Sequence, residues 1–287
     1  AAEDLTELAL STFLCGCSMG PLRLTLAALL LGARFVPSGG ALHEPRSEEA
    51  AADDACLLQL VSDSPAFRAA DPLVYVLTVD TAIGRKRYAM LAATVGQVGI
   101  TSFQKVEGVS VAKYHTEEAL QASPLAVMSD EQKRSWETTR YRSNGALACA
   151  IGHSHIWRLA REALSKPGAP RWAVILEDDA LVNTTMSIND ALAMVSDEAD
   201  LAFFDGRFCR YHPPGLLSGG LGSSWGSTAY AVTARGAAAL LAKPVFMPSD
   251  EWLRVPLEDG RVKGFCGEVL FVESKVTPSE RSDKTGE

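Results

Sequence analysis

Three acidic residues stand in a row directly after the apolar stretch RWAVIL at 171–176: Glu177, Asp178 and Asp179. Carboxylates packed this closely repel one another, and burying them costs free energy unless a cation compensates their charge. Successive side chains of a strand point to opposite faces, so we expect Glu177 and Asp179 to project together and Asp178 to point away. Hard divalent cations prefer such oxygen ligands. The pattern predicts a metal site, with a solvated acidic turn as the alternative.

Two other apolar stretches also end on a carboxylate, at Asp80 and at Asp205. In open α/β sheets, ligands bind beyond the carboxyl ends of the strands. Phosphate oxygens of such a ligand would complete the shell of a cation held by the acidic triple. The net charge of −8 argues against a nucleic-acid partner, which needs a broad basic surface. An anionic ligand therefore has to be held by a local cluster or by a metal.

The elements that must position these carboxylates alternate along the chain. The segment 109–142 is expected to be a long loop with one helical piece. We expect strands over 73–80, 103–108, 172–179, 201–207 and 268–274, helices over 85–99, 145–164 and 186–195, and a strand running into a helix over 227–242. This alternation predicts an α/β fold with a single mostly parallel sheet flanked by helices.

One histidine of the helix over 145–164 is expected to face the interior. At about 100° per residue, His153 shares a face with Ile156 and Trp157, whereas His155 falls on the opposite face. His153 is therefore predicted to be buried and His155 to face water. An inward histidine is more often a satisfied core residue than a functional one, so both roles stay open at this point.

The six cysteines include no CxxC pair and no grouping with histidine typical of a zinc finger. The chain is also too long and too poor in cysteine to be a disulfide scaffold. A single bridge among Cys56, Cys149, Cys209 and Cys266 remains open.

The N-terminal part resembles a secretory signal. From Met19 a basic residue precedes the apolar run 24–32, and small residues follow it. Two alternatives stay open: a membrane anchor over 8–31, or an ordinary amphipathic helix. We expect the secretory pathway, in the ER or Golgi lumen, with membrane contact only through such an anchor.

The composition divides the chain into three parts. Residues 1–38 would be an N-terminal extension plus the signal peptide or anchor. Residues 39–72, which are rich in Ala, Asp and Glu, would be a stem or linker, and residues 73–287 a single folded domain.

Five motifs occur in a fixed order: VYVLTVD, GALACAIGHSHIW, VILEDD, GSTAYAVTARGAAALL and MPSDEWL. Together they resemble glycosyltransferase family 25, which includes bacterial lipo-oligosaccharide galactosyltransferases and eukaryotic procollagen galactosyltransferases. The resemblance covers residues 73–287, and the ending PSERSDKTGE looks like the eukaryotic branch. Each motif is modest alone, whereas the ordered set is specific.

The resemblance implies a GT-A type nucleotide-diphospho-sugar transferase fold and a divalent metal, Mn²⁺ or Mg²⁺. It implies inverting transfer of a hexose, with galactose favoured, from a UDP-sugar (UDP-galactose first, UDP-glucose next). The acceptor would be a hydroxyl of a glycan or of a collagen-like protein with hydroxylysine. Glu177 and Asp179 would then hold the metal, and Asp178 would contact the donor sugar or ribose.

The resemblance also points to donor-binding residues. Asp80 is kept from the family's first-strand motif, and the family's histidine stands at His153. Arg85 and Arg87, slightly downstream of Asp80, would supply cationic contacts to phosphate. The alternative for both arginines is a solvated first helical turn.

Inverting transfer needs a base for the acceptor hydroxyl. Asp250 is the first candidate for this base or for an acceptor anchor, and Glu268 is the reserve. A helix N-cap is the structural alternative for Asp250, a role that suits aspartate. Trp225 and Trp252 are candidates for stacking on sugar, with core packing as the alternative.

Three positions depart from the family pattern: Thr81, Ala146 and Gly152. They motivate one alternative function, an inactive relative retained for adhesion or protein interaction. A metal-dependent hydrolase of nucleotide sugars or phosphate esters is the other alternative. Release of UDP that requires an acceptor separates the transferase from both.

Overall fold

The structure is a computed structural model that describes residues 71–140, 142–209, 212–217 and 226–273. These residues belong to one compact unit spanning 67–287. The predicted signal or anchor, nearly all of the predicted stem, and Trp225 lie outside the described residues. Within the described part, no helix has both the length and the apolar character needed to span a membrane.

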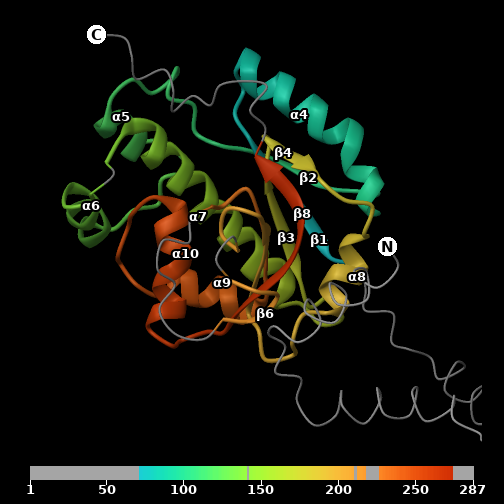
Figure 1. The fold of residues 1–287 in the computed structure, drawn as a ribbon. Helices are drawn as coiled ribbons and strands as arrows, with labels where there is room; N and C mark the ends of the chain where they lie inside the picture. Colours follow the sequence, from blue (N-terminus) through green and yellow to red (C-terminus); the bar gives the residue numbers. More distant parts are fainter. Residues whose placement is uncertain (1–70, 141, 210–211, 218–225, 274–287) are drawn as a thin grey trace, which may run out of the picture. The chain divides into compact units, whose positions relative to one another are not determined.

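A single curved sheet forms the centre of the unit (Figure 1). Its main path has the order β2-β1-β3-β7-β5-β8-β4, and β6 pairs with β8. The pairings give β1, β2, β3, β5 and β8 a common direction, which β7, β4 and β6 oppose, so the predicted mostly parallel sheet is confirmed. The strands are β1 (Leu73–Thr78), β2 (Gln104–Glu107), β3 (Ala173–Glu177), β4 (Ala180–Val182), β5 (Leu201–Asp205), β6 (Gly215–Leu216), β7 (Ala229–Val232) and β8 (Gly264–Glu273).

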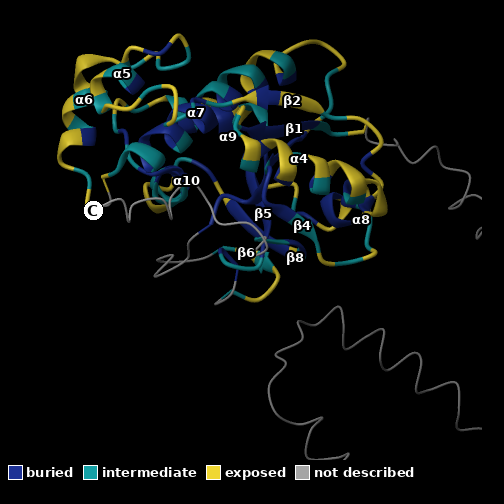
Figure 2. Cartoon of the chain, turned by 90° about the horizontal axis from the view of Figure 1, so that it is seen from above, coloured by how far each residue is buried: buried dark blue, intermediate teal, exposed yellow. Residues whose placement is uncertain are grey.

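Helices cover both faces of this sheet. They are α4 (Ala82–Thr94) with the 3₁₀ turn η1 (Val95–Val98), α5 (Glu117–Gln121), α6 (Asp130–Glu137), α7 (Asn144–Leu164), α8 (Ile188–Ala193), α9 (Ala234–Leu241) and α10 (Ser249–Glu258). Alternate residues of β1 belong to two separate cores: Tyr75 and Leu77 to one with α7, α9 and α10, and Val74 and Val76 to one with α4 and α8. Figure 2 shows buried strands with helices whose outer surfaces are exposed.

The long helix α7 lies against β1 because Gly152 permits a close approach. A Cβ atom at this position would lie 3.0 Å from Cδ1 of Leu77, tighter than ordinary contact. Ser143 caps the helix by accepting a hydrogen bond of 3.1 Å from the amide of Ala146. Gly152, a departure from the family motif, thus has a packing role in this chain.

Several predicted boundaries differ from those observed. The segment 109–142 contains two capped helices rather than one helical piece, and α6 carries a full capping box between Ser129 and Gln132. Helix α4 begins at Ala82 rather than at 85, because the Thr81 side chain accepts from the Gly84 amide at 3.0 Å. Strand β8 begins at Gly264 rather than at 268. Thr81, another departure from the family pattern, is therefore a helix cap.

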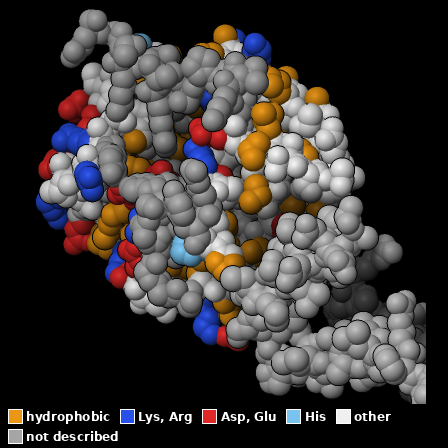
Figure 3. All heavy atoms as spheres, in the orientation of Figure 1, with side chains coloured by type: hydrophobic (Ala, Val, Ile, Leu, Met, Phe, Trp, Pro, Cys, Tyr) orange, Lys and Arg blue, Asp and Glu red, His pale blue; other side chains and the backbone are white. Residues whose placement is uncertain are grey.

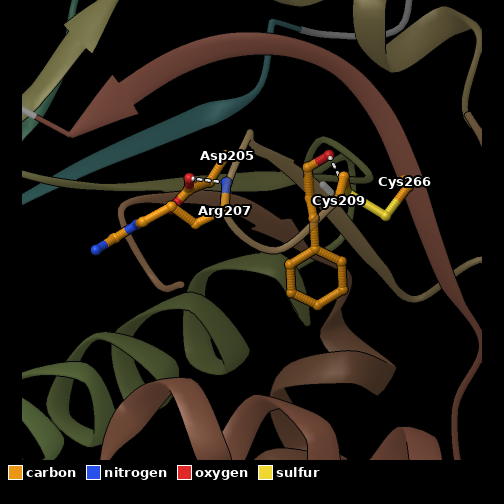
Figure 4. The surroundings of a disulfide bond; sticks show 5 residues. Asp205, Arg207, Cys209 and Cys266 are labelled. Carbon is orange, nitrogen blue, oxygen red and sulfur yellow. Dashed lines mark hydrogen bonds and ion pairs between the residues drawn. A yellow bond between two sulfur atoms is a disulfide. The ribbon is translucent and has the colours of Figure 1, made fainter. Parts of the chain in front are cut away.

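A disulfide joins Cys209, just after β5, to Cys266 in β8 (Figure 4). The sequence left four cysteines open for one bridge, and the structure selects this pair. Cys149 is a free, half-buried thiol on α7. Cys56 lies outside the described residues.

Candidate active site

The acidic triple lies where β3 ends and the chain turns toward β4. The Glu177 amide donates to the Thr228 carbonyl and the Asp178 amide to the Leu77 carbonyl, both at 2.9 Å, so neighbouring strands hold the turn. All three carboxylates line one cavity of about 100 Å³. Glu177 meets His153 from α7 on one face of the sheet, whereas Asp178 meets Arg87 from α4 on the other, so Asp178 points away from Glu177 as predicted.

Asp178 is buried and fully engaged by protein groups. Arg87 Nη2 lies 2.8 Å from Oδ1, and the Thr78 hydroxyl donates to Oδ2 at 2.8 Å. Burial raises the pKa of Asp178 to about 6, although the Arg87 guanidinium opposes the rise. With both oxygens engaged, Asp178 is a poor candidate for direct contact with a ligand.

Asp179 has the opposite character. Its side chain is 6% exposed, and among the described residues its Oδ1 atom is buried without a hydrogen-bond partner. Burial, followed by repulsion from Glu177, raises the pKa of Asp179 to about 7. A divalent cation would satisfy the unpartnered oxygen and relieve this repulsion, so Asp179 suits the predicted metal site.

Glu177 is held by side chains from two other elements. Its Oε1 accepts a hydrogen bond from the Ser227 hydroxyl and lies 3.0 Å from Nε2 of His153. The other ring nitrogen of His153, Nδ1, lies 2.8 Å from the Tyr230 hydroxyl oxygen, which also accepts from Trp157 Nε1 at 2.8 Å. The acidic turn is thus tied to α7 and β7.

The predicted orientation of His153 is confirmed, since its side chain has no exposed surface. Burial alone would lower the pKa of His153, but Tyr230, Cys149 and Glu177 outweigh it and raise that pKa well above its ordinary value. As an imidazolium, His153 donates from both nitrogens, to the Tyr230 oxygen and to Glu177. His155 is half-buried rather than fully exposed, and burial lowers its pKa.

A cysteine and two serines extend this network to the start of α10. Ser249 Oγ lies 3.1 Å from Ser227 Oγ and 3.3 Å from the sulfur of Cys149. The sequence motifs did not single out Cys149, Ser227 or Ser249 as site residues. The spacing of Cys149 four residues before His153 on one helix was the signal available, because residues i and i+4 share a face.

Asp250 follows Ser249 directly, in the first turn of α10. Pro248 occupies the N-cap position, so the predicted alternative of an Asp250 cap is wrong. Asp250 is half-buried and one residue from the network around Glu177. Glu268 is exposed on β8 and does not line the cavity of the acidic turn.

The two arginines after β1 have different surroundings. Arg85 Nη1 pairs with Asp80 Oδ1 at 2.7 Å, and both side chains are more than half exposed, as a solvated helical turn would have them. Arg87 is buried on Asp178, and within the described part its Nε and Nη1 atoms have no hydrogen-bond partner. Only Arg87 of the two lines the cavity of the acidic triple.

A larger cavity of about 540 Å³ adjoins the first. Gly108 and Val109 line both of them, and Asp80, Lys113 and Tyr114 line the larger one. The two cavities together extend from the acidic turn across the ends of β1 and β2. This space is large enough for a ligand of nucleotide size.

Arg207, just after β5, lies among further carboxylates. Its backbone amide donates to Oδ1 of the buried Asp205 at 2.7 Å (Figure 4). Its Nη2 lies 3.3 Å from Oδ2 of Asp205, and its Nη1 pairs with Glu273 at 2.7 Å. Acidic and basic side chains also lie close together near the middle of the face in Figure 3.

The predicted sugar-stacking role of Trp252 is wrong, because its ring is buried and Nε1 donates to the Leu240 carbonyl at 2.8 Å.

One family model matches part of the chain. Residues 72–211 match the model of glycosyltransferase family 25 (LPS biosynthesis protein). No curated protein sequence matches the chain significantly.

Among solved structures, one similar chain is a glycosyltransferase involved in the glycosylation of the major capsid of PBCV-1. It is 12% identical, with a TM-score of 0.38, and the match covers 74% of this chain and 96% of that one. Mouse xyloside xylosyltransferase 1 in its apo form is 11% identical, with a TM-score of 0.30, and the match covers 69% and 79%. Because these scores are low, the function of this chain is inferred from the family match and from the geometry of the site.

Proposed function

Since its match to glycosyltransferase family 25 supports a glycosyltransferase, we propose that this chain is a metal-dependent inverting enzyme that uses a UDP-sugar. The hexose moved would be galactose, with glucose as the next candidate. The acceptor would be a hydroxyl of a glycan or of a hydroxylysine-type, collagen-like protein. The observation that carries this proposal is the buried carboxylate oxygen of Asp179 beside Glu177, which has no hydrogen-bond partner in the described part of the chain.

The donor set fits a hard divalent ion, Mn²⁺ or Mg²⁺. Asp179 would hold it through its free oxygen and Glu177 through the carboxylate that His153 and Ser227 orient. When bound, the ion neutralises the diphosphate as it leaves. Asp178 would act indirectly, because its ion pair with Arg87 holds that side chain at the cavity wall.

The larger cavity supports a nucleoside-diphosphate donor. The nucleoside would bind in this cavity, beyond the ends of β1 and β2, where Asp80 is one of the lining residues. The diphosphate would extend from there toward the acidic turn. The unpartnered Nε and Nη1 groups of Arg87 suit a phosphate oxygen at that junction. Arg85, exposed on Asp80, would then have no part in phosphate binding.

The remaining step is proton removal from the acceptor. In our proposal the Asp250 carboxylate takes the hydroxyl proton while the acceptor oxygen bonds to the anomeric carbon and the bond to UDP breaks. UDP leaves with the bonding electron pair. The place of Asp250 beside Ser249, which contacts the network around Glu177, supports this role.

We also propose that the chain acts in the secretory pathway, in the ER or Golgi lumen. The Cys209–Cys266 disulfide supports an oxidising compartment, where such bonds persist. Import of the chain into microsomes with removal of roughly 20 residues after Met19 would test this location.

A donor screen tests the central proposal. The purified protein is incubated with each UDP-sugar, with Mn²⁺ or with a chelator, and UDP release is measured with and without acceptors. We expect release that needs both Mn²⁺ and an acceptor. Release without any acceptor would indicate a hydrolase, and no release with any donor would favour a non-catalytic relative.

A further inference from the structure

A second group of metal-binding atoms lies beside the acidic turn. Cys149 and His153 stand one helical turn apart on α7, and Glu177 faces them from the end of β3. The cysteine sulfur, a histidine ring nitrogen and a glutamate oxygen all lie within 4.8 Å of one another. Tetrahedral zinc ligands lie about 3.3–3.8 Å apart, as bonds of about 2.0–2.3 Å require. Small side-chain movements would therefore bring these three atoms onto one ion.

We propose that Cys149, His153 and Glu177 form a second cation site, for a thiophilic divalent ion such as zinc. Thiolate and imidazole favour zinc, whereas carboxylates alone favour magnesium or manganese. The fourth position would be open to water, because Cys149 and Glu177 both line the 100 Å³ cavity. Such a site, with three protein ligands and one open position, is a common zinc arrangement.

The surroundings of His153 support metal binding through Nε2. On metal binding the ring would lose its Nε2 proton and keep the Nδ1 proton, which it donates to the Tyr230 oxygen at 2.8 Å, and the Nε2 lone pair would then bind the ion beside Glu177. A hydrogen bond from the second ring nitrogen is the usual means of orienting a histidine ligand. The full burial of the ring holds it in that orientation.

Glu177 would belong to both sites, so the two ions compete for it. Zinc on Cys149 and His153 draws Glu177 away from the carboxylate pair with Asp179, and zinc should therefore inhibit the manganese-dependent reaction. Zinc binding itself does not depend on the proposed function, whereas this inhibition rests on it. The two can therefore fail separately.

The test is metal binding by the metal-free full chain. Zinc is titrated in competition with a chromophoric chelator, and Co²⁺ is titrated in parallel by absorption. We expect one zinc per chain and a thiolate-to-cobalt charge-transfer band in the near ultraviolet. Cys149→Ser should lose the band and weaken zinc binding by at least about tenfold. Glu177→Gln should weaken zinc binding and keep the thiolate-to-cobalt band. This second variant tests the site even if Cys149→Ser does not fold.

Two controls separate this site from others. The combined change Cys15→Ser, Cys17→Ser, Cys56→Ser should keep both the band and the zinc affinity, which excludes the thiols from outside the described residues. Asp179→Asn should also keep them, although it removes a proposed manganese ligand. An unchanged band in folded Cys149→Ser, or unchanged zinc affinity in folded Glu177→Gln, would overturn the second site. Loss of the manganese requirement alone would count only against the proposed function.

Discussion

Nε2 of His153 lies 3.0 Å from Oε1 of Glu177 and joins a completely buried ring to a carboxylate at the cavity wall. The contact connects the middle of α7 to the end of β3. It gives Glu177 a fixed position and compensates one of the three acidic charges gathered at this turn. His153 is in this sense a positioning residue, since it acts on the site through Glu177.

Replacing this histidine should affect stability far more than replacing its neighbour on the helix. His153→Ala opens a hole in the core and removes partners from Glu177 and Tyr230, so we expect a loss of about 2–3 kcal/mol in unfolding free energy. His155→Ala should cost less than about 1 kcal/mol, because that side chain is half-buried. Urea denaturation of both variants measures the difference. Equal losses would contradict the arrangement described for α7.

The pair of Arg87 and Asp178 should behave as a buried ion pair. Asp178→Ala leaves a guanidinium that is less than a tenth exposed without its counter-ion, and a loss of about 3–5 kcal/mol is typical of such a change. The double change Arg87→Met, Asp178→Leu should cost less than either single change, because no unpaired charge remains. Chemical denaturation of the two single variants and the double variant gives the coupling. Additive losses would show that the contact contributes little.

Asp250→Asn should lower turnover strongly and leave donor affinity nearly intact. A base acts on the acceptor hydroxyl in the transition state and need not touch the nucleotide. The measurements are kcat and the KM for UDP-sugar with saturating Mn²⁺. Glu268→Gln serves as the control, since Glu268 is exposed and lines neither cavity. If Asp250→Asn kept normal turnover, its role would be confined to the first turn of α10.

The parts of the fold that local patterns specify were predictable. Strands β1, β3, β5 and β7 are short apolar runs, and the regular 3.6-residue period of α7 is sufficient to place His153 on the inward face. Boundaries were less predictable where a single cap decides them. Thr81 caps α4, so this helix begins before the predicted residue 85. Pro248 occupies the N-cap position of α10, which the sequence had offered to Asp250.

The chemistry of the acidic turn was only partly predictable, because long-range pairing decides it. The type and spacing of Glu177 and Asp179 indicate a cation, but the sequence does not show that Asp178 meets Arg87 from a helix about ninety residues earlier. The contacts of Cys149 with Ser249, and of Ser249 with Ser227, likewise join α7, α10 and the segment before β7. The sequence left Trp252 open between sugar stacking and core packing for the same reason, since its carbonyl partner lies on another helix.

The metal-free protein should become less stable as the pH rises toward neutrality. The folded-state pKa values of Asp178 and Asp179, about 6 and about 7, exceed the ordinary value of 3.8, so the folded state holds more protons than the unfolded state between about pH 4 and 7. The unfolding free energy should therefore fall across this window. Urea midpoints from pH 4 to 8 measure the fall. Asp179→Asn should reduce it, and Mn²⁺ should oppose it; an unchanged slope in the variant would contradict the raised pKa.

Asp179→Ala is the sharpest test of the metal site. The change removes a repelling carboxylate from a buried cluster, so the fold should survive and the metal-free protein should be no less stable than before. Turnover should drop about a thousandfold or more, because several kcal/mol of transition-state stabilisation are lost when no ion neutralises the leaving diphosphate. Binding of UDP-sugar, measured by calorimetry with and without Mn²⁺, should also become insensitive to the ion. Circular dichroism confirms folding, and Glu268→Gln is the matched carboxylate control. If the folded Asp179→Ala variant keeps manganese-dependent transfer, the unpartnered oxygen of Asp179 is not a metal ligand and the proposed mechanism fails.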